Sequence, residues 1–401
     1  MAKSLTVEVA IVGGGPAGLT AAIALAEAGI ETALIARRPN PDHRTTALLA
    51  SSVTALATLG IWSSCEAQAA PLRLMRIVDA TARLVRAPEV CFAASEIGLD
   101  AFGHNIENRH LLAALDARAA TLTSLTRIED DASVIETGEA GATVSLSHGE
   151  SISARLVIGA DGRRSLSRTA AGIDSDGRNY PQTALTFNLA HTRPHHDTST
   201  EFHTESGPFT LVPLPGNRSS LVCVVDPVEA EHLASLDDAA LRDEIERRSH
   251  SILGKITIEP GRGTFPLAVE TVQTFAQNRI ALIGEAAHLI PPIGAQGLNL
   301  GLRDAACIAE LVVSSRRDGG DVGADAVLAR YDADRRADVK SRTMAVDLLN
   351  RTLLSDFLPV QSARGLGLYL IDRFGPLRRA VLREGVAPAA SQPRLMRGEA
   401  L

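Results

Sequence analysis

The segment VEVAIVGGGPAGLTAAIALAEA, residues 7–28, decides the fold of this chain of 401 residues. Its beginning is apolar enough for a buried parallel strand, and its end carries apolar side chains on nearly all sides, as a helix packed on a sheet does. In the glycine-rich turn between them, Gly13 would make a tight turn, Gly15 would admit a pyrophosphate and Gly18 would allow close helix–strand packing. The helix N-terminus would offer unpaired N–H groups to the phosphates. The segment therefore predicts a Rossmann-like dinucleotide-binding unit.

The second predicted strand, residues 31–36, ends without the acidic residue that commonly binds a ribose at this point. Ala36, Arg37 and Arg38 stand there instead. Taken alone, the two arginines would indicate NADP, because an arginine here can accept a 2′-phosphate. The alternative is that both are solvated residues before a turn at residues 39–41, and the rest of the chain must decide.

Composition limits the class of protein. The net charge of −7 provides no basic field of the kind that attracts nucleic acid. The cysteines are far apart and form no CxxC pair, which favours free thiols in a reducing compartment over disulfides or zinc; they are Cys65, Cys91, Cys223 and Cys307. The first strand begins too early for a signal peptide, and no apolar run reaches the roughly 18 residues of a membrane span. We expect a cytoplasmic globular protein.

Two further clusters indicate which nucleotide is bound. Residues 154–168, ARLVIGADGRRSLSR, read as a strand followed by the pair Asp161-Gly162, which as a bland alternative is a common β-turn. Residues 279–312 read as a strand ending at Gly284-Glu285, a Pro- and Gly-rich loop, and a helix from about Leu298. The carboxylate can bind polyol hydroxyls, and the positive helix N-terminus suits a cofactor that becomes anionic on reduction, as a flavin does.

The three motifs, in this order and spacing, resemble the FAD-dependent aromatic hydroxylases of the para-hydroxybenzoate hydroxylase superfamily. Within it, GAQGLNLGLRDA at residues 294–305 and DLLNRTLLSDFLP at residues 347–359 are similar to the ubiquinone-biosynthesis hydroxylases of the UbiH/UbiF type. The resemblance covers about residues 5–385. It implies FAD as cofactor, NADPH or NADH as electron donor, and O2 as the source of the oxygen that hydroxylates an electron-rich ring.

The resemblance also implies which residues bind the cofactor, while no catalytic side chain is assigned. The glycine-rich turn would hold the pyrophosphate, Arg44 would reach back to the cofactor, and Arg109 would lie near the phosphates and ribitol. An Asp–Gly pair would serve both FAD and NAD(P)H, an acid would bind the ribitol, and a loop would line the isoalloxazine. The full set is Gly13, Gly15, Ala17, Gly18, Arg37, Arg44, Arg109, Asp161, Gly162, Glu285, Pro292, Gly297, Leu298 and Asn299.

Two positions depart from the family pattern. Glu285 replaces the usual aspartate; it is one methylene longer and keeps the carboxylate. Ala36 replaces the ribose-binding acid, so contacts to the adenosine must come from Arg37, the backbone or water. His288 lies beside the flavin site, and we interpret it as a packing or loop residue rather than a catalytic one.

The predicted fold is α/β (α+β overall), with a doubly wound Rossmann-like FAD domain, an inserted antiparallel-sheet substrate domain and a C-terminal helical segment. Alternating strands and helices assign residues 1–70, 96–178 and 266–342 to the FAD domain and residues 71–95 and 179–265 to the substrate domain. Residues 343–385 are expected to be helical and residues 386–401 to be a disordered tail. No metal-ligand cluster or Ser/His/Asp arrangement competes with this reading.

The expected function is hydroxylation of a lipid-like substrate, a polyprenyl phenol of ubiquinone biosynthesis. The alternatives are a hydroxylase of a soluble phenolic acid and a non-catalytic FAD-binding subunit. Between Arg342 and Arg383, arginines mixed with apolar residues give a local charge of +4, which suits an amphipathic helix at the inner face of an anionic membrane. The competing reading is that these helices pack on their own domain or a second subunit. A homodimer and a quinone-biosynthesis complex are both left open.

Overall fold

The structure is a computed structural model that describes residues 4–37, 42–81, 86–292, 294–354, 367, 373–386 and 392–401. Among these residues, no helix combines the length and the apolar character needed to cross a membrane. Arg38 and the expected turn at residues 39–41 lie outside the described residues.

The first sheet carries the glycine-rich turn and runs in the order β18-β19-β11-β1-β2-β8. β1 pairs in parallel with β11 on one side and with β2 on the other, so that Val12 lies beside both Gly159 and Ile35. A hairpin of β9 and β10 extends the sheet through β11. The strands are β1 (Ser4–Val12), β2 (Thr32–Ile35), β8 (Leu125–Ile128), β9 (Ala132–Thr137), β10 (Ala142–Leu146), β11 (Ser151–Gly159), β18 (Ala276–Gln277) and β19 (Ile280–Leu282).

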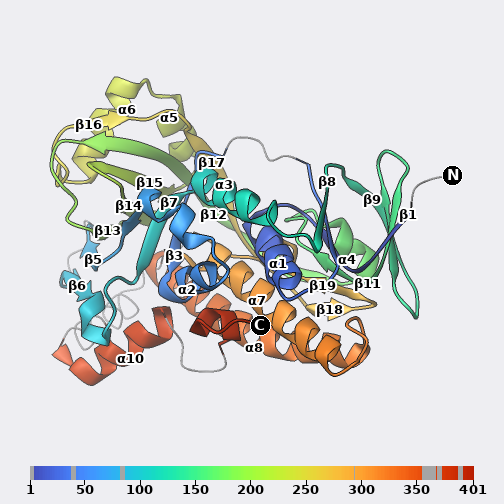
Figure 1. Cartoon of the computed structure of the whole chain (residues 1–401). Coiled ribbons are helices and arrows are strands. Elements are labelled where there is room, and N and C mark those ends of the chain that lie inside the picture. The colour runs from blue at the N-terminus through green and yellow to red at the C-terminus, as the bar shows by residue number, and fades with distance from the viewer. Residues whose placement is uncertain are drawn as a thin grey trace.

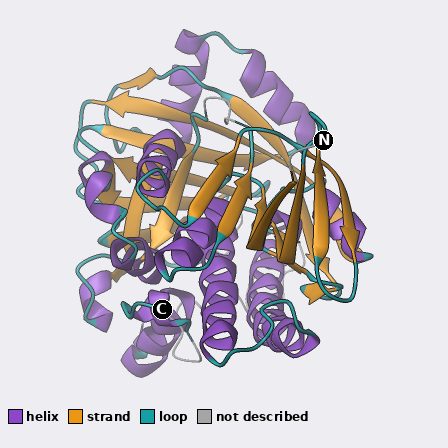
Figure 2. Cartoon of the chain, turned by 45° about the vertical axis from the view of Figure 1, so that its right-hand side comes forward, coloured by secondary structure: helices purple, strands orange, loops and turns teal. Residues whose placement is uncertain are grey.

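Helices far apart in the sequence pack on this sheet (Figure 1). α1 is buried along most of its length because it consists of small and apolar residues, and it packs against α3 and α7. The long helices α7 and α8 lie side by side (Figures 1 and 2). The helices are α1 (Pro16–Glu27), α3 (Asn108–Ala119), α4 (Leu166–Ala171), α7 (Gln296–Arg317) and α8 (Asp325–Leu354), and the short turn η4 (Gly284–Ala286) follows β19.

A second, nine-stranded sheet is mainly antiparallel and runs in the order β20-β17-β12-β15-β14-β13-β5-β6, with β16 beside β12. α5 and α6 cover one face, where Leu233 and Leu241 pack with Phe187 (Figure 1). The elements are β5 (Leu74–Asp79), β6 (Val90–Ala93), β12 (Ser175–His191), β13 (Thr198–His203), β14 (Pro208–Leu214), β15 (Arg218–Val225), α5 (Pro227–Ser235), α6 (Asp238–Arg248), β16 (Ile256–Ile258), β17 (Gly263–Val272) and β20 (His288–Leu289). The two sheets and their helices confirm the predicted fold class.

A third, small sheet was not predicted. It joins β3 (Thr45–Leu49), β7 (Gly103–Glu107) and β4 (Ala69–Pro71) in the order β3-β7-β4. α2 (Ala50–Thr58) follows β3 directly, and the turns η1 (Trp62–Ser64), η2 (Glu66–Gln68) and η3 (Ala94–Ile97) complete this region.

The C-terminus corrects one expectation. We expected residues 386–401 to be disordered, but residues 392–401 pack on the body of the protein through η5 (Arg394–Arg397), which contacts α2 and α7. Leu395 and Met396 are buried there, and this apolar pair supplies the contact area that a solvated tail would lack. α10 (Gly375–Val386) precedes this segment.

Candidate functional site

A cavity of about 770 Å³ opens at the C-terminal ends of β1, β2 and β8. Ligands bind at this edge of doubly wound sheets. Five of the residues predicted to bind the cofactor line the cavity, together with residues from the end of β8; the five are Gly13, Gly15, Arg37, Arg44 and Asp161.

The glycine-rich turn has the shape that a phosphate cradle requires. Gly13 has a φ of 115°, and a Cβ atom there would lie 2.2 Å from the carbonyl oxygen of Ala160. A Cβ at Gly18 would lie 2.1 Å from the carbonyl oxygen of Gly13, so neither position tolerates a side chain. At Gly15 a Cβ would meet no atom within 4 Å. Gly15 is also the N-cap of α1, where no side chain caps the helix; Pro16 has no N–H, so the N–H groups of Ala17 and Gly18 remain available for an anion.

Three small residues bring the distant motifs together. A Cβ at Gly301 of α7 would lie 3.2 Å from the Cα of Gly284 and 3.4 Å from the Cβ of Ala17. α1, η4 and α7 therefore meet at van der Waals distance. This contact places the glycine-rich turn, the acid Glu285 and the start of α7 around one region.

Arg44 lines the cavity and pairs with Asp42. Its Nε and NH2 atoms donate to both carboxylate oxygens of Asp42, at 2.9 and 2.8 Å, and its guanidinium lies 5.4 Å from the ring centroid of Phe265. The hydrogen bonds to Asp42 raise the pKa of Arg44 against desolvation, and the nearby charge of Glu285 adds to the effect. Burial acts to raise the pKa of Asp42, but hydrogen bonds from Arg44 and Asn108 lower it to about 2.

Asp161 and Arg109 are already engaged by neighbouring residues. Asp161 Oδ1 accepts from the hydroxyl of Ser165 at 2.5 Å, and Oδ2 accepts from the N–H of Ser167 at 2.9 Å, so the carboxylate holds the start of α4. Gly162 follows with a φ of 75°. Arg109, which does not line the cavity, donates to Glu107 at 3.0 Å from a half-exposed position.

The residues expected to line the isoalloxazine lie at the start of α7 and in the loop before it, in different environments. Asn299 is buried, its Oδ1 accepts from the N–H of Leu49 at 2.8 Å, and its Nδ2 donates to the carbonyl of Ala47 at 2.8 Å. Its side chain therefore fastens β3 to α7. Gly297 and Leu298 lie in the first turn of α7, and a Cβ at Gly297 would meet open space. Pro292 is exposed in the preceding loop.

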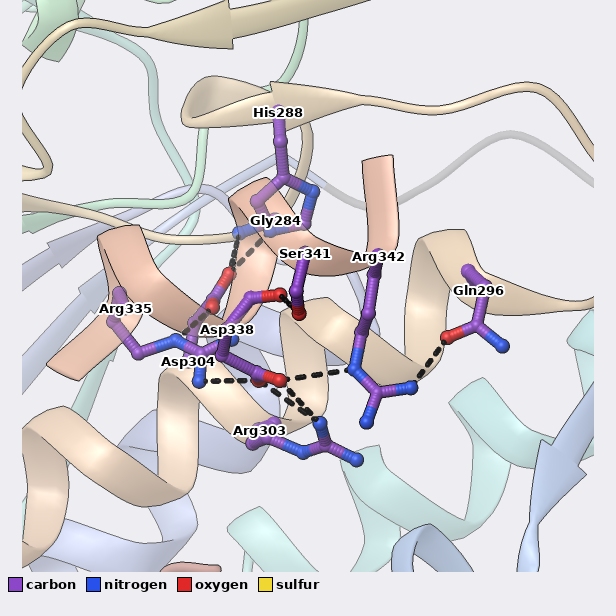
Figure 3. A network of polar contacts seen from close by, with 9 residues as sticks. All are labelled: Gly284, His288, Gln296, Arg303, Asp304, Arg335, Asp338, Ser341 and Arg342. Carbon is purple, nitrogen blue, oxygen red and sulfur yellow. Dashed lines mark hydrogen bonds and ion pairs between the residues drawn. The ribbon is translucent and has the colours of Figure 1, made fainter. Parts of the chain in front are cut away.

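A buried ionic network lies behind this helix, and sequence reasoning did not find it (Figure 3). Asp304 accepts from the N–H of Gly284 at 2.9 Å and from Arg335 Nε at 2.6 Å, and its Oδ2 lies 2.7 Å from His288 Nε2. Desolvation opposes ionisation, but His288 and Arg335 hold the pKa of Asp304 below its usual range. On α8, Asp338 binds three arginines, one of which also donates to Gln296 at 3.2 Å; they are Arg303, Arg335 and Arg342.

The network joins η4 to the first turn of α7 (Figure 3). The sequence held one signal for it, because Arg335, Asp338 and Arg342 recur at the spacing of one helical face. His288 is buried within this network, which agrees with its interpretation as a packing or loop residue.

Comparison with known proteins gives consistent results. The model of a family described as "FAD binding domain" matches residues 6–346. "Ubiquinone hydroxylase UbiL" of Rhodospirillum rubrum is 36% identical over 406 residues, which covers 98% of this chain and 92% of the relative. "3-Demethoxyubiquinol 3-hydroxylase" of Escherichia coli is 32% identical over 387 residues, covering 94% and 97%. The crystal structure of p-nitrophenol 4-monooxygenase PnpA from Pseudomonas putida shares the fold with a TM-score of 0.79 at 20% identity, covering 96% and 100% of the chains.

Proposed function

Because the chain belongs to the FAD binding domain family, we propose that it hydroxylates the aromatic ring of a polyprenyl phenol intermediate of ubiquinone biosynthesis, using NAD(P)H and O2. The family assignment confirms FAD as the cofactor predicted from the three motifs. One observation carries the choice of substrate: relatives named as a ubiquinone hydroxylase and a 3-demethoxyubiquinol 3-hydroxylase match this chain over nearly its whole length.

The residues around the cavity fit FAD. The open space at Gly15 and the uncapped start of α1 would accept the pyrophosphate, with Gly13 and Gly18 supplying the close packing that shapes the cradle. Glu285 would accept hydrogen bonds from the ribitol hydroxyls, and its charge acts on Arg44 of the cavity to raise the pKa of that guanidinium. Asp161, which lines the cavity after the end of β11, would close it on that side with Gly162 next in the chain, and Ala17 keeps α1 close to η4.

Bound FAD would supply the redox chemistry of the reaction, with NAD(P)H as the electron donor and O2 as the oxygen source. The part of the protein would be to orient the ring. The first turn of α7, with Gly297 and Leu298, carries a positive partial charge that would stabilise negative charge on the reduced ring. Asn299 holds this turn against β3, and the Asp304 network holds it against η4. Arg109 would contribute to the phosphate end only after leaving Glu107.

The membrane-facing surface that we propose is smaller than the sequence indicated. Arg342 and Arg378 are both buried; Arg378 donates to Glu96 at 2.5 Å and its guanidinium lies 4.5 Å from the ring centroid of Phe92. Of the other arginines in this segment, Arg364 lies outside the described residues. Phe374, just before α10, is 62% exposed, and Leu377 and Val381 on α10 are 42 and 43% exposed. Arg379 and Arg383 are exposed on the same helix. Apolar side chains flanked by basic ones suit an anionic bilayer surface, where the lipid-like substrate is found.

The function is tested by supplying the gene to cells that lack a ubiquinone hydroxylase and identifying the quinone precursors that remain. Loss of one precursor and restoration of ubiquinone are expected. If the protein oxidises NAD(P)H only when a soluble phenolic acid is added, the result would support the alternative function, hydroxylation of a soluble phenolic acid. Oxidation that releases only hydrogen peroxide with every substrate would support a non-catalytic subunit.

The surface is tested by co-sedimentation of the full chain with vesicles of anionic lipid. The triple variant Phe374→Ser, Leu377→Ser and Val381→Ser should bind less, while Val228→Ser, which alters a 77% exposed apolar residue on α5, should bind normally. Arg378 is left intact because it holds α10 to η3. Equal sedimentation of the triple variant and the parent protein would contradict the proposed membrane contact. Another protein would then have to deliver the lipid.

A further inference from the structure

The cofactor cavity has an acidic side chain that no family motif assigns. The strand β2 ends at Ile35 and is followed by Ala36, whose methyl group cannot bind a ribose. β8 lies beside β2 in parallel, with Ile35 next to Ile128, and the N–H of Ala36 donates to the carbonyl of Ile128 at 3.0 Å. The residues that follow β8 therefore reach the same part of the cavity as residue 36.

Two aspartates follow β8 and line the cavity, but they differ in what they can do. Asp130 is buried, and its carboxylate accepts from the N–H of Asp131 at 2.7 Å and from the N–H of His148 at 3.2 Å, with His148 Nδ1 at 2.8 Å from Oδ1. That carboxylate shapes the turn. Asp131 is 47% exposed at the cavity, and its Oδ2 lies 2.5 Å from Arg37 NH2.

The ion pair with Asp131 also affects which nucleotide Arg37 can bind. A lone arginine after β2 would favour a 2′-phosphate, whereas this arginine is already neutralised by a carboxylate that would repel one. An acid in this position favours free hydroxyl groups instead, because a carboxylate is an acceptor for two of them.

We propose that Asp131, oriented by Arg37, binds the adenosine ribose hydroxyls of FAD and so replaces the acid that is missing at residue 36. The acid that binds the ribose would then follow β8 rather than the neighbouring strand β2. The proposal rests on FAD as the cofactor and not on which ring is hydroxylated.

The test measures the affinity of apoprotein for FAD and for analogues that lack the 2′- or the 3′-hydroxyl of the adenosine ribose. Asp131→Asn should weaken FAD about 10-fold, as expected for a lost hydrogen bond to a charged group. The parent protein should discriminate against at least one analogue, and Asp131→Asn should lose that discrimination. Adding Ala36→Glu to Asp131→Asn should restore it.

The matched control is Asp334→Asn, which breaks a comparable exposed pair with Arg330 on α8 and should leave FAD affinity unchanged. Equal weakening of FAD and both analogues by Asp131→Asn would reduce Asp131 to a structural residue and overturn the proposal. So would discrimination that follows the adenine amino group, tested with the hypoxanthine analogue of FAD. Each measurement concerns binding, so it is independent of whether the loaded enzyme hydroxylates a polyprenyl phenol.

Discussion

His288 Nε2 and Asp304 Oδ2 lie 2.7 Å apart, and their side chains are 1% and 0% exposed. The contact joins the segment after η4 to the middle of α7, and Arg335 of α8 binds the other oxygen of the same carboxylate. A histidine enclosed in this way has no open path to a substrate. We therefore interpret the contact between His288 and Asp304 as one that holds the flavin-binding elements η4 and α7 rigidly together.

Asp304→Ala should strongly destabilise the protein, because the buried His288 and the Nε of Arg335 lose the carboxylate that they share, while NH1 of Arg335 keeps its partner, Asp338. Loss of one partner of a buried pair typically costs about 3–5 kcal/mol. Urea unfolding of the apoprotein measures this without a contribution from FAD. Asp334→Ala, on the exposed side of α8, should change the free energy of unfolding by about 0.5 kcal/mol or less. Similar unfolding midpoints for both variants would contradict the assignment.

Gly15→Val should give folded protein without flavin. Gly15 has φ −70° and ψ 173°, which any residue adopts, and its Cβ would meet open space, so the new side chain would fill only the phosphate cradle. Gly18→Val, by contrast, would strike the carbonyl oxygen of Gly13 and should impair folding itself. Circular dichroism and the flavin absorbance per chain separate the two effects. Retention of one FAD per chain in Gly15→Val would show that the glycine-rich turn does not bind the pyrophosphate.

Glu285→Ala should weaken FAD by roughly 10- to 150-fold, the range for a hydrogen bond to a charged group. Glu285→Asp should be tolerated, because it keeps the carboxylate. Titration of apoprotein with FAD measures both affinities, and thermal unfolding of the apoproteins checks that the fold is intact. An unchanged affinity in the alanine variant would exclude Glu285 from the ribitol site.

Asp42 predicts a pH dependence of stability. Its pKa in the folded protein is about 2, below the ordinary value of 3.8, so its contribution is present above pH 3.8 and is lost as the pH falls toward 2. Asp42→Asn should remove this part of the acid sensitivity. The measurement is the free energy of unfolding of parent and variant apoprotein between pH 2 and pH 5, and parallel curves would contradict the prediction.

Replacing Arg37 and Arg38 by alanine should barely alter the discrimination between NADPH and NADH. The first site holds FAD, and Arg37 is paired with Asp131. The ratio of kcat/KM for the two nucleotides measures this discrimination. A lost preference for NADPH would mean that the arginines bind the pyridine nucleotide.

The sequence predicted those parts of the site that depend on local chemistry. Gly13 was identified for the tight turn and Gly18 for close packing of helix and strand, and in the structure a Cβ at either position would clash with a backbone carbonyl. The roles of Arg44 and Glu285 remain predictions, although the charge of Glu285 contributes to the raised pKa of Arg44.

What the sequence did not predict depends on contacts between distant segments. The small sheet of β3, β7 and β4 has short strands whose partners lie more than 30 residues away. The charge of Asp304 is balanced by Arg335 on a different helix. Arg109 turns to Glu107, a choice among neighbouring charges that residue types alone do not decide.

The pairing of β1 with β11 determines when the phosphate cradle can be completed during synthesis of the chain. Residues 4–12 leave the ribosome before their partner, because residues 151–159 and the carbonyl of Ala160 that supports Gly13 emerge some 140 residues later. At about 5–20 residues per second, this delay is on the order of ten seconds. η4 and α7 emerge later still. A nascent N-terminal half thus has no completed cradle, and capture of the flavin becomes one of the last events in the maturation of the protein.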